Sequence, residues 1–370
     1  MKHTDSRIQI LRQPLVLGFL VAGILIGPFG PFSLIKDTTM LTNFSDIAIV
    51  LLLFGVGLTF PITQLRNIGK LGAVIAVIEV VVMLGIGLGV GLAFGWSMMD
   101  SMFLAAALSI SSTAIIVKVL EEMGVIEEPS SLLLIGVLVI EDLIAAVLIS
   151  TLHSSVLSGA FSFDQMLWEI ARIGMFIGGT VAFGCLGMPK IFALLSNIPR
   201  YEFTILVALG LAFGLSFLSH ELGFSAATGA FLAGVILAGS RFSEDIINLI
   251  TPIREVFVAI FFVTIGALMD VNIIAQYWLP IIIITLVTIV GKTASVYLGV
   301  RLFQLGPNNA LGIGLSMAQL GEFSFIVLMV GQDLGATSPF LFPIVGMVVV
   351  LTTILAPFLI KKGTKMLVAY

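Results

Sequence analysis

Glu141 and Asp142 lie next to each other in a stretch of the chain that is otherwise apolar. Residues 132–140 before them and residues 143–148 after them carry no charge and no hydroxyl group. An ionised side chain in such an environment is costly, so it faces water, pairs with an opposite charge or binds a proton. Carboxylate oxygens are also the ligands that hard cations prefer. We therefore expect Asp142, with Glu141 beside it, to belong to a site that binds a cation or a proton.

Lys292, Glu79 and Glu322 each lie in another apolar stretch. We expect Lys292 and Glu322 to take part in charge pairing, with Glu141 as the favoured partner of Lys292. A buried pair of this kind could also serve only to fix how helices pack. Glu79 could likewise pair with another residue, or extend its carboxyl group to the membrane surface, without taking part in transport. Adjacent residues of a helix point about 100° apart, so Glu141 and Asp142 do not converge as an intramembrane aspartyl protease requires.

Small polar residues interrupt two apolar stretches, at residues 109–113 and 316–322. Discontinuous helices in corresponding places are typical of ion sites, because freed carbonyls and half-helix ends can meet charge there. The alternative is that these hydroxyls only bond back to their own helix or join helices together. We expect Ser111, Ser112 and Thr113 to bind the cation with Asp142, and Ser109, Gln319 and Gly321 to lie in the unwound segments.

The elements that position these residues must be membrane-spanning helices. Of the 370 residues, 59% are apolar and only 10% are charged, and the mean hydropathy is +1.20. A soluble protein carries about 25% charged residues, so the composition excludes a soluble enzyme, a nucleic-acid binder and a disordered chain. The single cysteine, Cys185, excludes an intrachain disulfide framework, and continuous apolar runs exclude a transmembrane β-barrel.

Runs of about 20 apolar residues, the length that crosses a bilayer, predict an all-α protein with about twelve spans. Both termini are then cytoplasmic, since fourteen of the fifteen Lys and Arg outside the spans fall on one side and only Lys36 on the other. The expected spans are 14–30, 43–60, 69–95, 98–118, 130–152, 167–189, 201–219, 223–240, 253–268, 279–300, 309–332 and 339–360.

Three short motifs of the first half recur in the second half in the same order. Residues 18–27 resemble 229–238, residues 53–58 resemble 262–267, and residues 107–112 resemble 314–319. An odd number of spans separates each copy from its partner, so the two copies run through the membrane in opposite directions. We therefore expect one transporter domain, 1–370, with an inverted repeat at 14–152 and 201–360 around a linking helix at 167–189. Such repeats are typical of secondary transporters.

As a set, six motifs resemble the cation:proton antiporter-2 family, which includes glutathione-gated potassium efflux systems and bacterial sodium/proton exchangers. The motifs begin at Leu17, Leu108, Val139, Gly229, Phe261 and Gly321, and they read LGFLVAG, LSISSTA, VIED, GAFLAG, FFVTIG and GEF. The resemblance implies the sodium/proton antiporter fold, with two crossed broken helices in a core domain and a separate dimerisation domain. It also implies that Asp142 is the carboxylate that takes protons and the cation in turn.

The chain departs from the family pattern in three places. The family's first helix is missing, since the span 201–219 has no counterpart before Pro14. The residue before the key aspartate is Asp, Asn or Gln in the subgroups, whereas here Glu141 keeps a second titratable acid, as in the sodium exchangers. The chain also ends at Tyr370 without a nucleotide-binding domain, so gating of the glutathione kind has no support in the sequence.

The resulting prediction is an antiporter that exchanges Na⁺, or else Li⁺ or K⁺, for H⁺ by an elevator-type movement of the core domain. We expect a homodimer in the lipid bilayer of a prokaryotic cytoplasmic membrane, with no enzyme activity, no cofactor and no nucleic-acid partner. The alternatives are a K⁺/H⁺ efflux antiporter, and a cation channel or symporter that uses the same site.

Overall fold

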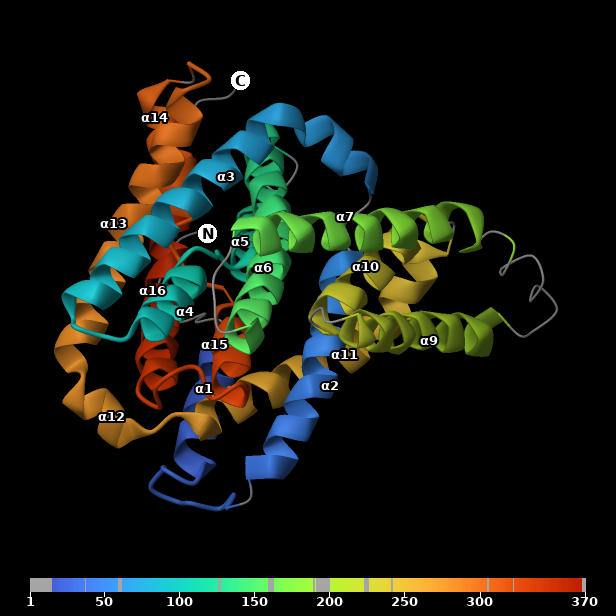
Figure 1. Ribbon diagram of the computed structural model, residues 1–370. Helices are drawn as coiled ribbons and strands as arrows, with labels where there is room; N and C mark the ends of the chain where they lie inside the picture. Colours follow the sequence, from blue (N-terminus) through green and yellow to red (C-terminus); the bar gives the residue numbers. More distant parts are fainter. Residues whose placement is uncertain are drawn as a thin grey trace, which may run out of the picture.

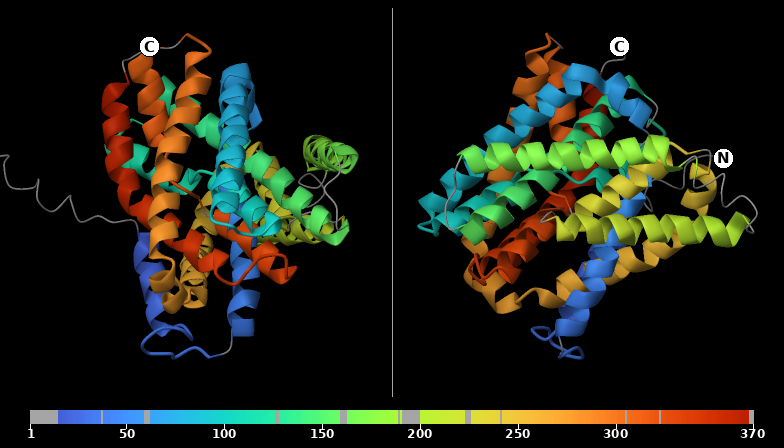
Figure 2. Two further views of the ribbon diagram at one scale, coloured as in Figure 1. Left: turned by 60° about the vertical axis from the view of Figure 1, so that its left-hand side comes forward. Right: turned by 45° about the vertical axis from the view of Figure 1, so that its right-hand side comes forward.

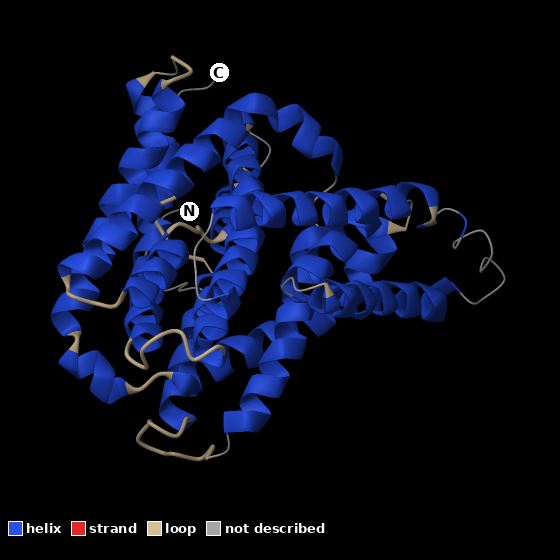
Figure 3. Ribbon diagram, in the orientation of Figure 1, coloured by secondary structure: helices blue, strands red, loops and turns tan. Residues whose placement is uncertain are grey.

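The computed structural model describes the chain as an assembly of helices. It covers residues 15–36, 38–58, 62–125, 128–158, 163–188, 190, 200–222, 226–240, 242–304, 306–321 and 323–367. Within these residues the elements are helical (Figure 3), and β-structure is limited to one isolated bridge between Ser111 and Leu320. This agrees with the all-α class expected from the composition.

The helices follow the expected apolar runs. The first half of the chain forms α1 (Leu15–Ile26), α2 (Thr38–Leu58), α3 (Ile62–Ala93), α4 (Met98–Leu108), α5 (Thr113–Met123), α6 (Pro129–Ser158) and α7 (Phe163–Leu186). The second half forms α9 (Arg200–Glu221), α10 (Ala226–Ala238), α11 (Ser243–Leu268), α12 (Val271–Gln276), α13 (Trp278–Arg301), α14 (Pro307–Ser316), α15 (Phe323–Asp333) and α16 (Leu341–Met366).

Each of the expected spans overlaps a helix, and the two spans with polar interruptions are each divided in two. In the described part of the chain, six helices are long and apolar enough to cross a membrane on their own. Large apolar side chains also face outwards, for example Leu206 on α9 and Leu186 on α7, both 72% exposed. The protein is therefore a multi-pass membrane protein, while the total of twelve spans stays a prediction.

The helices pack in two groups. One group contains α3, α4, α5, α6 and the C-terminal helices α13, α14, α15 and α16, and the other contains α1, α2, α7, α9, α10 and α11. Figure 1 shows α13, α14 and α16 at one side of the molecule, with α7 and α9 reaching away at the other. The turned views in Figure 2 keep the same separation. Among the described residues, the main contacts between the groups join α6 with α7, α3 with α10 and α1 with α16.

Two pairs of glycines allow helices of the second group to touch backbone to backbone. A Cβ added to Gly23 on α1 would lie 2.1 Å from the carbonyl oxygen of Val263 on α11, and one added to Gly266 on α11 would lie 2.1 Å from the carbonyl oxygen of Leu20. Gly57 on α2 and Gly234 on α10 approach in the same manner. Small residues permit this close packing in membranes, where no hydrophobic driving force brings helices together.

Candidate ion-binding site

Two interrupted helices cross in the middle of the first group. Helix α4 ends at Leu108 and α5 begins at Thr113, while α14 ends at Ser316 and α15 begins at Phe323. The segments between these ends are not helical and pair with each other, since the Gly321 N–H donates a hydrogen bond of 3.1 Å to the carbonyl oxygen of Ile110. The two breaks that the sequence places at 109–113 and 316–322 therefore meet in space.

Gly321 is required where the segments touch. A Cβ at this position would lie 2.4 Å from the carbonyl oxygen of Ser111, so only glycine permits the contact without a shift of backbone. The Ser111 hydroxyl donates to the carbonyl oxygen of Met317 at 3.3 Å, and the Leu320 N–H donates to the Thr352 hydroxyl of α16 at 3.3 Å. These contacts give hydrogen-bond partners to backbone groups that have none within a helix. Such groups must be paired inside a membrane, because no water is available to them there.

Asp142 lies beside this crossing. Its Oδ2 accepts a hydrogen bond of 3.0 Å from the hydroxyl of Thr113, and the two side chains are 3% and 8% exposed. Thr113 is the first residue of α5, and the positive end of a helix dipole favours negative charge nearby. A buried carboxyl at this position can therefore hold either a proton or a cation.

Glu141 contacts the same segment through a different atom. Its Oε2 accepts the backbone N–H of Ser111 at 3.0 Å, and the side chain is fully buried. Its second oxygen, Oε1, has no hydrogen-bond partner among the described residues. The neighbouring acids thus approach the crossing from α6 without facing each other, as expected for adjacent residues of one helix.

Lys292 corrects one of our expectations. It forms a fully buried ion pair with Glu79 of α3, whereas the sequence favoured Glu141 as its partner. The reason lies in the packing, because α3 contacts both α13, which carries Lys292, and α6, which carries Glu141. The side chains of Glu79 and Glu141 are both fully buried. For Glu79 the sequence left open pairing or a position at the membrane surface, and the structure shows it buried and paired.

The other expected site residues take different positions. Ser109 bonds back to the carbonyl oxygen of Ala106 at 2.8 Å, and the Ser112 hydroxyl accepts the Ile115 N–H at 3.3 Å at the start of α5. Gln319 is fully buried, and neither polar atom of its amide has a partner within the described part of the chain. Glu322 lies outside the described residues. The hydroxyl of Thr113 is placed on Asp142.

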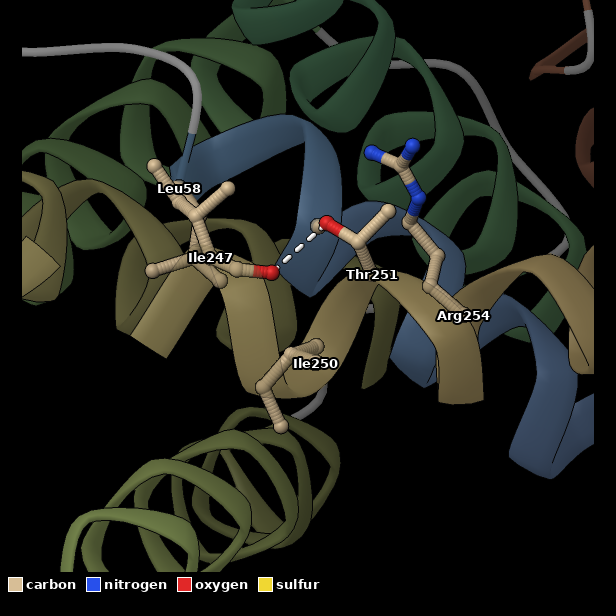
Figure 4. Close-up of a pocket in the computed structure, with 6 residues that line it drawn as sticks. Leu58, Ile247, Ile250, Thr251 and Arg254 are labelled. Carbon is tan, nitrogen blue, oxygen red and sulfur yellow. Dashed lines mark hydrogen bonds between the residues drawn. The ribbon is translucent and has the colours of Figure 1, made fainter. Parts of the chain in front are cut away.

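A small hollow lies between α2 and α11, away from the helix that carries Glu141 and Asp142 (Figure 4). It has room for about one water molecule, roughly 10 Å³. In Figure 4 Thr251 points back to the carbonyl oxygen of Ile247, with a hydrogen bond of 2.6 Å. The residues that line the hollow are Gly55, Leu58, Ile247, Ile250, Thr251 and Arg254. The hollow contains none of the expected site residues and is too small for a solute.

Comparison with known proteins gives a family match over nearly the whole chain. The family model described as "sodium/hydrogen exchanger, transmembrane" matches residues 4–362. The chain is 32% identical over 335 residues to YbaL of Escherichia coli (strain K12), which is named as a cation/proton antiporter; the match covers 88% of this chain and 59% of the relative. It is 27% identical to a Na⁺/H⁺ antiporter of Enterococcus hirae, with 98% and 94% of the two chains covered.

Two further comparisons bear on length and fold. The chain is 28% identical to K⁺ efflux antiporter 5 of Arabidopsis thaliana over 88% of its own length, but spans only 58% of that relative. The solved sodium proton antiporter MjNhaP1 of Methanocaldococcus jannaschii matches with a TM-score of 0.70 at 17% identity, covering 95% of this chain and 92% of that one. At this identity the likeness concerns the fold alone, and it agrees with the antiporter fold that the motifs implied.

Proposed function

The chain belongs to the sodium/hydrogen exchanger family, whose model matches residues 4–362, and on this premise we propose that it exchanges a monovalent cation for H⁺ across the membrane. The observation that carries the proposal is the buried carboxyl group of Asp142, held by the Thr113 hydroxyl beside two crossed, interrupted helices. An acid in this position takes up a proton in one state of the cycle and the cation in another.

The mechanism is competition between the two ions for Asp142. Burial in an apolar core favours the neutral, protonated carboxyl. A partly dehydrated cation, bound by Asp142 and the Thr113 hydroxyl, displaces the proton, because oxygen donors suit hard cations. Ser111 and Ser112 are the further proposed oxygen ligands; the hydroxyl of Ser111 also donates to the carbonyl oxygen of Met317, and that of Ser112 caps the start of α5. The ends of four half-helices also meet at the crossing, so partial charges of both signs lie near the ion.

Na⁺ is the favoured cation, with Li⁺ and K⁺ as the other candidates. Glu141 supports this choice, because it gives the site a second titratable acid like that of the two-acid sodium exchangers. A K⁺/H⁺ efflux antiporter is the second candidate, since one relative is named for K⁺ efflux. A channel or symporter with the same site differs from an antiporter in one measurable way: cation binding does not release a proton.

We also propose that residues 14–152 and 201–360 form an inverted repeat around the linking helix at 167–189. The repeated motifs relate α1 to α10 and α2 to α11. If each helix is replaced by its counterpart in the other repeat, the contact of Gly23 with Gly266 corresponds to the contact of Gly234 with Gly57. In both contacts the two backbones approach closely. The crossing of the two broken helices lies where the same symmetry relates residues 107–112 to 314–319.

The two helix groups support an elevator-type cycle, in which the group that carries Asp142 moves against the other group. The second group then provides the dimer interface of a homodimer. We place the protein in the cytoplasmic membrane of a prokaryote with both termini cytoplasmic, as the distribution of Lys and Arg favours. The proposed cycle moves a cation and a proton across the membrane and converts neither into another compound, so the proposed activity is transport rather than enzyme catalysis.

The test is Asp142→Asn in proteoliposomes, with a pH-sensitive dye that reports proton flux when Na⁺, K⁺ or Li⁺ is added separately. The substitution keeps the shape of the side chain and removes its charge, so we expect exchange to stop while insertion and folding persist. Asp100→Asn is the matched control: Asp100 is also a buried aspartate, at 2% exposure, but it binds Ser338 at the far end of α4. Unchanged exchange in Asp142→Asn would remove Asp142 from the mechanism.

A further inference from the structure

Gln319 is a fully buried amide in the second broken helix. Its side chain has 0% exposure, and neither Oε1 nor Nε2 has a hydrogen-bond partner among the described residues. A primary amide accepts hydrogen bonds through its oxygen and donates them through its nitrogen, and burying both atoms without partners destabilises a fold. An apolar side chain of the same length would avoid this cost. The buried amide therefore points to a partner that is bound during part of the transport cycle.

The pairing of the two broken segments places Gln319 in the crossing. Leu320 forms an antiparallel bridge with Ser111, so the same register places Gln319 opposite Ser112. Directly opposite residues of an antiparallel pair have Cβ atoms about 4.5–5.5 Å apart. Gln319 therefore lies across from the residue that precedes Thr113 in the chain.

This part of the crossing has the charges and oxygen atoms that suit a cation. The Thr113 hydroxyl donates to Oδ2 of Asp142 at 3.0 Å. Helix α14 ends at Ser316, three residues before Gln319, and α4 ends at Leu108 on the other segment. The C-terminal ends of helices carry partial negative charge. Hard cations prefer oxygen ligands, and the amide oxygen of a glutamine is a neutral ligand of this kind.

We propose that Oε1 of Gln319 is a ligand of the transported cation. This inference rests on the proposed function, in which the cation displaces the proton of Asp142. The bound cation gives Oε1 the partner that it lacks in the structure. Because an amide does not titrate, Gln319 strengthens cation binding without adding a second group for which the proton competes.

Two substitutions separate the ligand oxygen from the rest of the side chain. Gln319→Met keeps the length and the unbranched shape but removes the amide, and its thioether is a soft ligand that hard cations do not prefer. Gln319→Glu keeps side-chain oxygen atoms and removes the two N–H donors. Loss of the oxygen should weaken cation binding in the methionine variant, whereas the glutamate variant should bind the cation at least as well as the parent.

Thr264→Val is the matched control. Thr264 lies on α11 in the other helix group, its side chain is 1% exposed, and its hydroxyl has no partner within the described part of the chain. Gln319→Met and Thr264→Val each remove a buried polar group without a partner, so neither should lower the melting temperature of the cation-free protein. The response to a cation should change in Gln319→Met alone.

The test is the melting temperature of the purified protein in detergent at alkaline pH, where protons compete least with the cation. NaCl, KCl or LiCl is added in turn, with choline chloride keeping the ionic strength constant. A cation that binds the folded protein raises its melting temperature. We expect the half-saturating cation concentration to rise about tenfold in Gln319→Met and to stay within twofold of the parent in Thr264→Val. Gln319→Leu replaces Gln319→Met if the methionine variant does not fold.

The same titration of Asp142→Asn separates this inference from the proposed function. If Asp142→Asn loses the response to cations while Gln319→Met keeps the parental one, Asp142 stands and Gln319 is not a ligand. If the response persists in Asp142→Asn and weakens in Gln319→Met, the assignment of Asp142 fails and Gln319 stands. Equal weakening in Gln319→Met and Gln319→Glu would mean that the amide nitrogen is the required atom, which overturns the proposal. A parent protein that no cation stabilises contradicts both.

Discussion

At the scale of the residue, the hydrogen bond from Thr113 to Asp142 links the first residue of α5 to the acid that we propose as the ion site. The bond length is 3.0 Å and both side chains are buried. A hydrogen bond to a charged group contributes about 1.5–3 kcal/mol. In the proposed site, the Thr113 hydroxyl would stabilise the ionised form of Asp142 by donating to its carboxylate, and it would also supply a ligand to the cation.

Thr113→Val should therefore weaken apparent cation affinity about tenfold, since 1.4 kcal/mol corresponds to one decade. The substitution keeps the branched shape and removes only the hydroxyl, and Thr113→Ser should largely restore affinity. The measurement is the cation concentration at half-maximal proton flux in proteoliposomes. Thr151→Val is the control, because Thr151 is also 8% exposed but bonds back to Val147 of its own helix. Equal effects of the two valine variants would remove Thr113 from the site.

The chemistry of the site was predictable to the level of residue types but not of partners. The sequence identified Asp142, Glu141 and Lys292 because charge is rare in apolar stretches. It did not predict the pairing of Lys292 with Glu79, because periodicity within one helix does not say which helix lies opposite. Glu79 and Lys292 are 213 residues apart, and no pattern within either helix pointed from one to the other.

At the scale of the element, the crossing depends on a close contact between two backbones, with no room for a side chain between them. Gly321 provides this contact with Ser111, and the isolated bridge between Ser111 and Leu320 aligns the two segments. The serine-rich and glycine-rich interruptions predicted both breaks. The sequence did not predict that Thr352 of α16 would accept the Leu320 N–H, because a threonine in an apolar helix more often bonds to its own turn.

Gly321→Ala should impair transport more than folding. The new Cβ would lie 2.4 Å from the carbonyl oxygen of Ser111, and relief of such overpacking costs about 1–3 kcal/mol and shifts the segment that carries the site. Gly89→Ala on α3 is the control, because a Cβ there meets nothing within 4 Å. We expect proton flux to fall at least tenfold in Gly321→Ala and to stay unchanged in Gly89→Ala. Parental flux in both variants would show that the close contact is not needed for transport.

At the scale of the whole molecule, the two helix groups give the proposed cycle its moving parts. Within the second group, glycine contacts such as Gly57 with Gly234 hold helices together at backbone distance. Between the groups, side chains meet instead: Val147 of α6 packs against Phe176 of α7 and Leu232 of α10. The composition predicted a helical membrane protein, but it could not assign helices to groups, because lipid-facing and protein-facing apolar residues are of the same types.

A cross-link between the groups should stop exchange if they move against each other. The background carries Cys185→Ser, which removes the single natural cysteine. Val147→Cys with Leu232→Cys, joined by a short bis-methanethiosulfonate reagent that forms a disulfide with each cysteine, ties α6 to α10. We expect proton flux to fall to the level of empty liposomes and to recover after the disulfides are reduced. The control pair is Gly184→Cys with Ile236→Cys, which joins α7 to α10 inside one group, where a Cβ on Gly184 would lie 2.7 Å from the Ile236 side chain. That pair should transport normally after cross-linking, because two helices that move together are not hindered when they are joined.

Full exchange in the cross-linked Val147–Leu232 pair would show that the ion crosses without relative movement of the groups at this contact. That result would favour a channel-like path past Asp142.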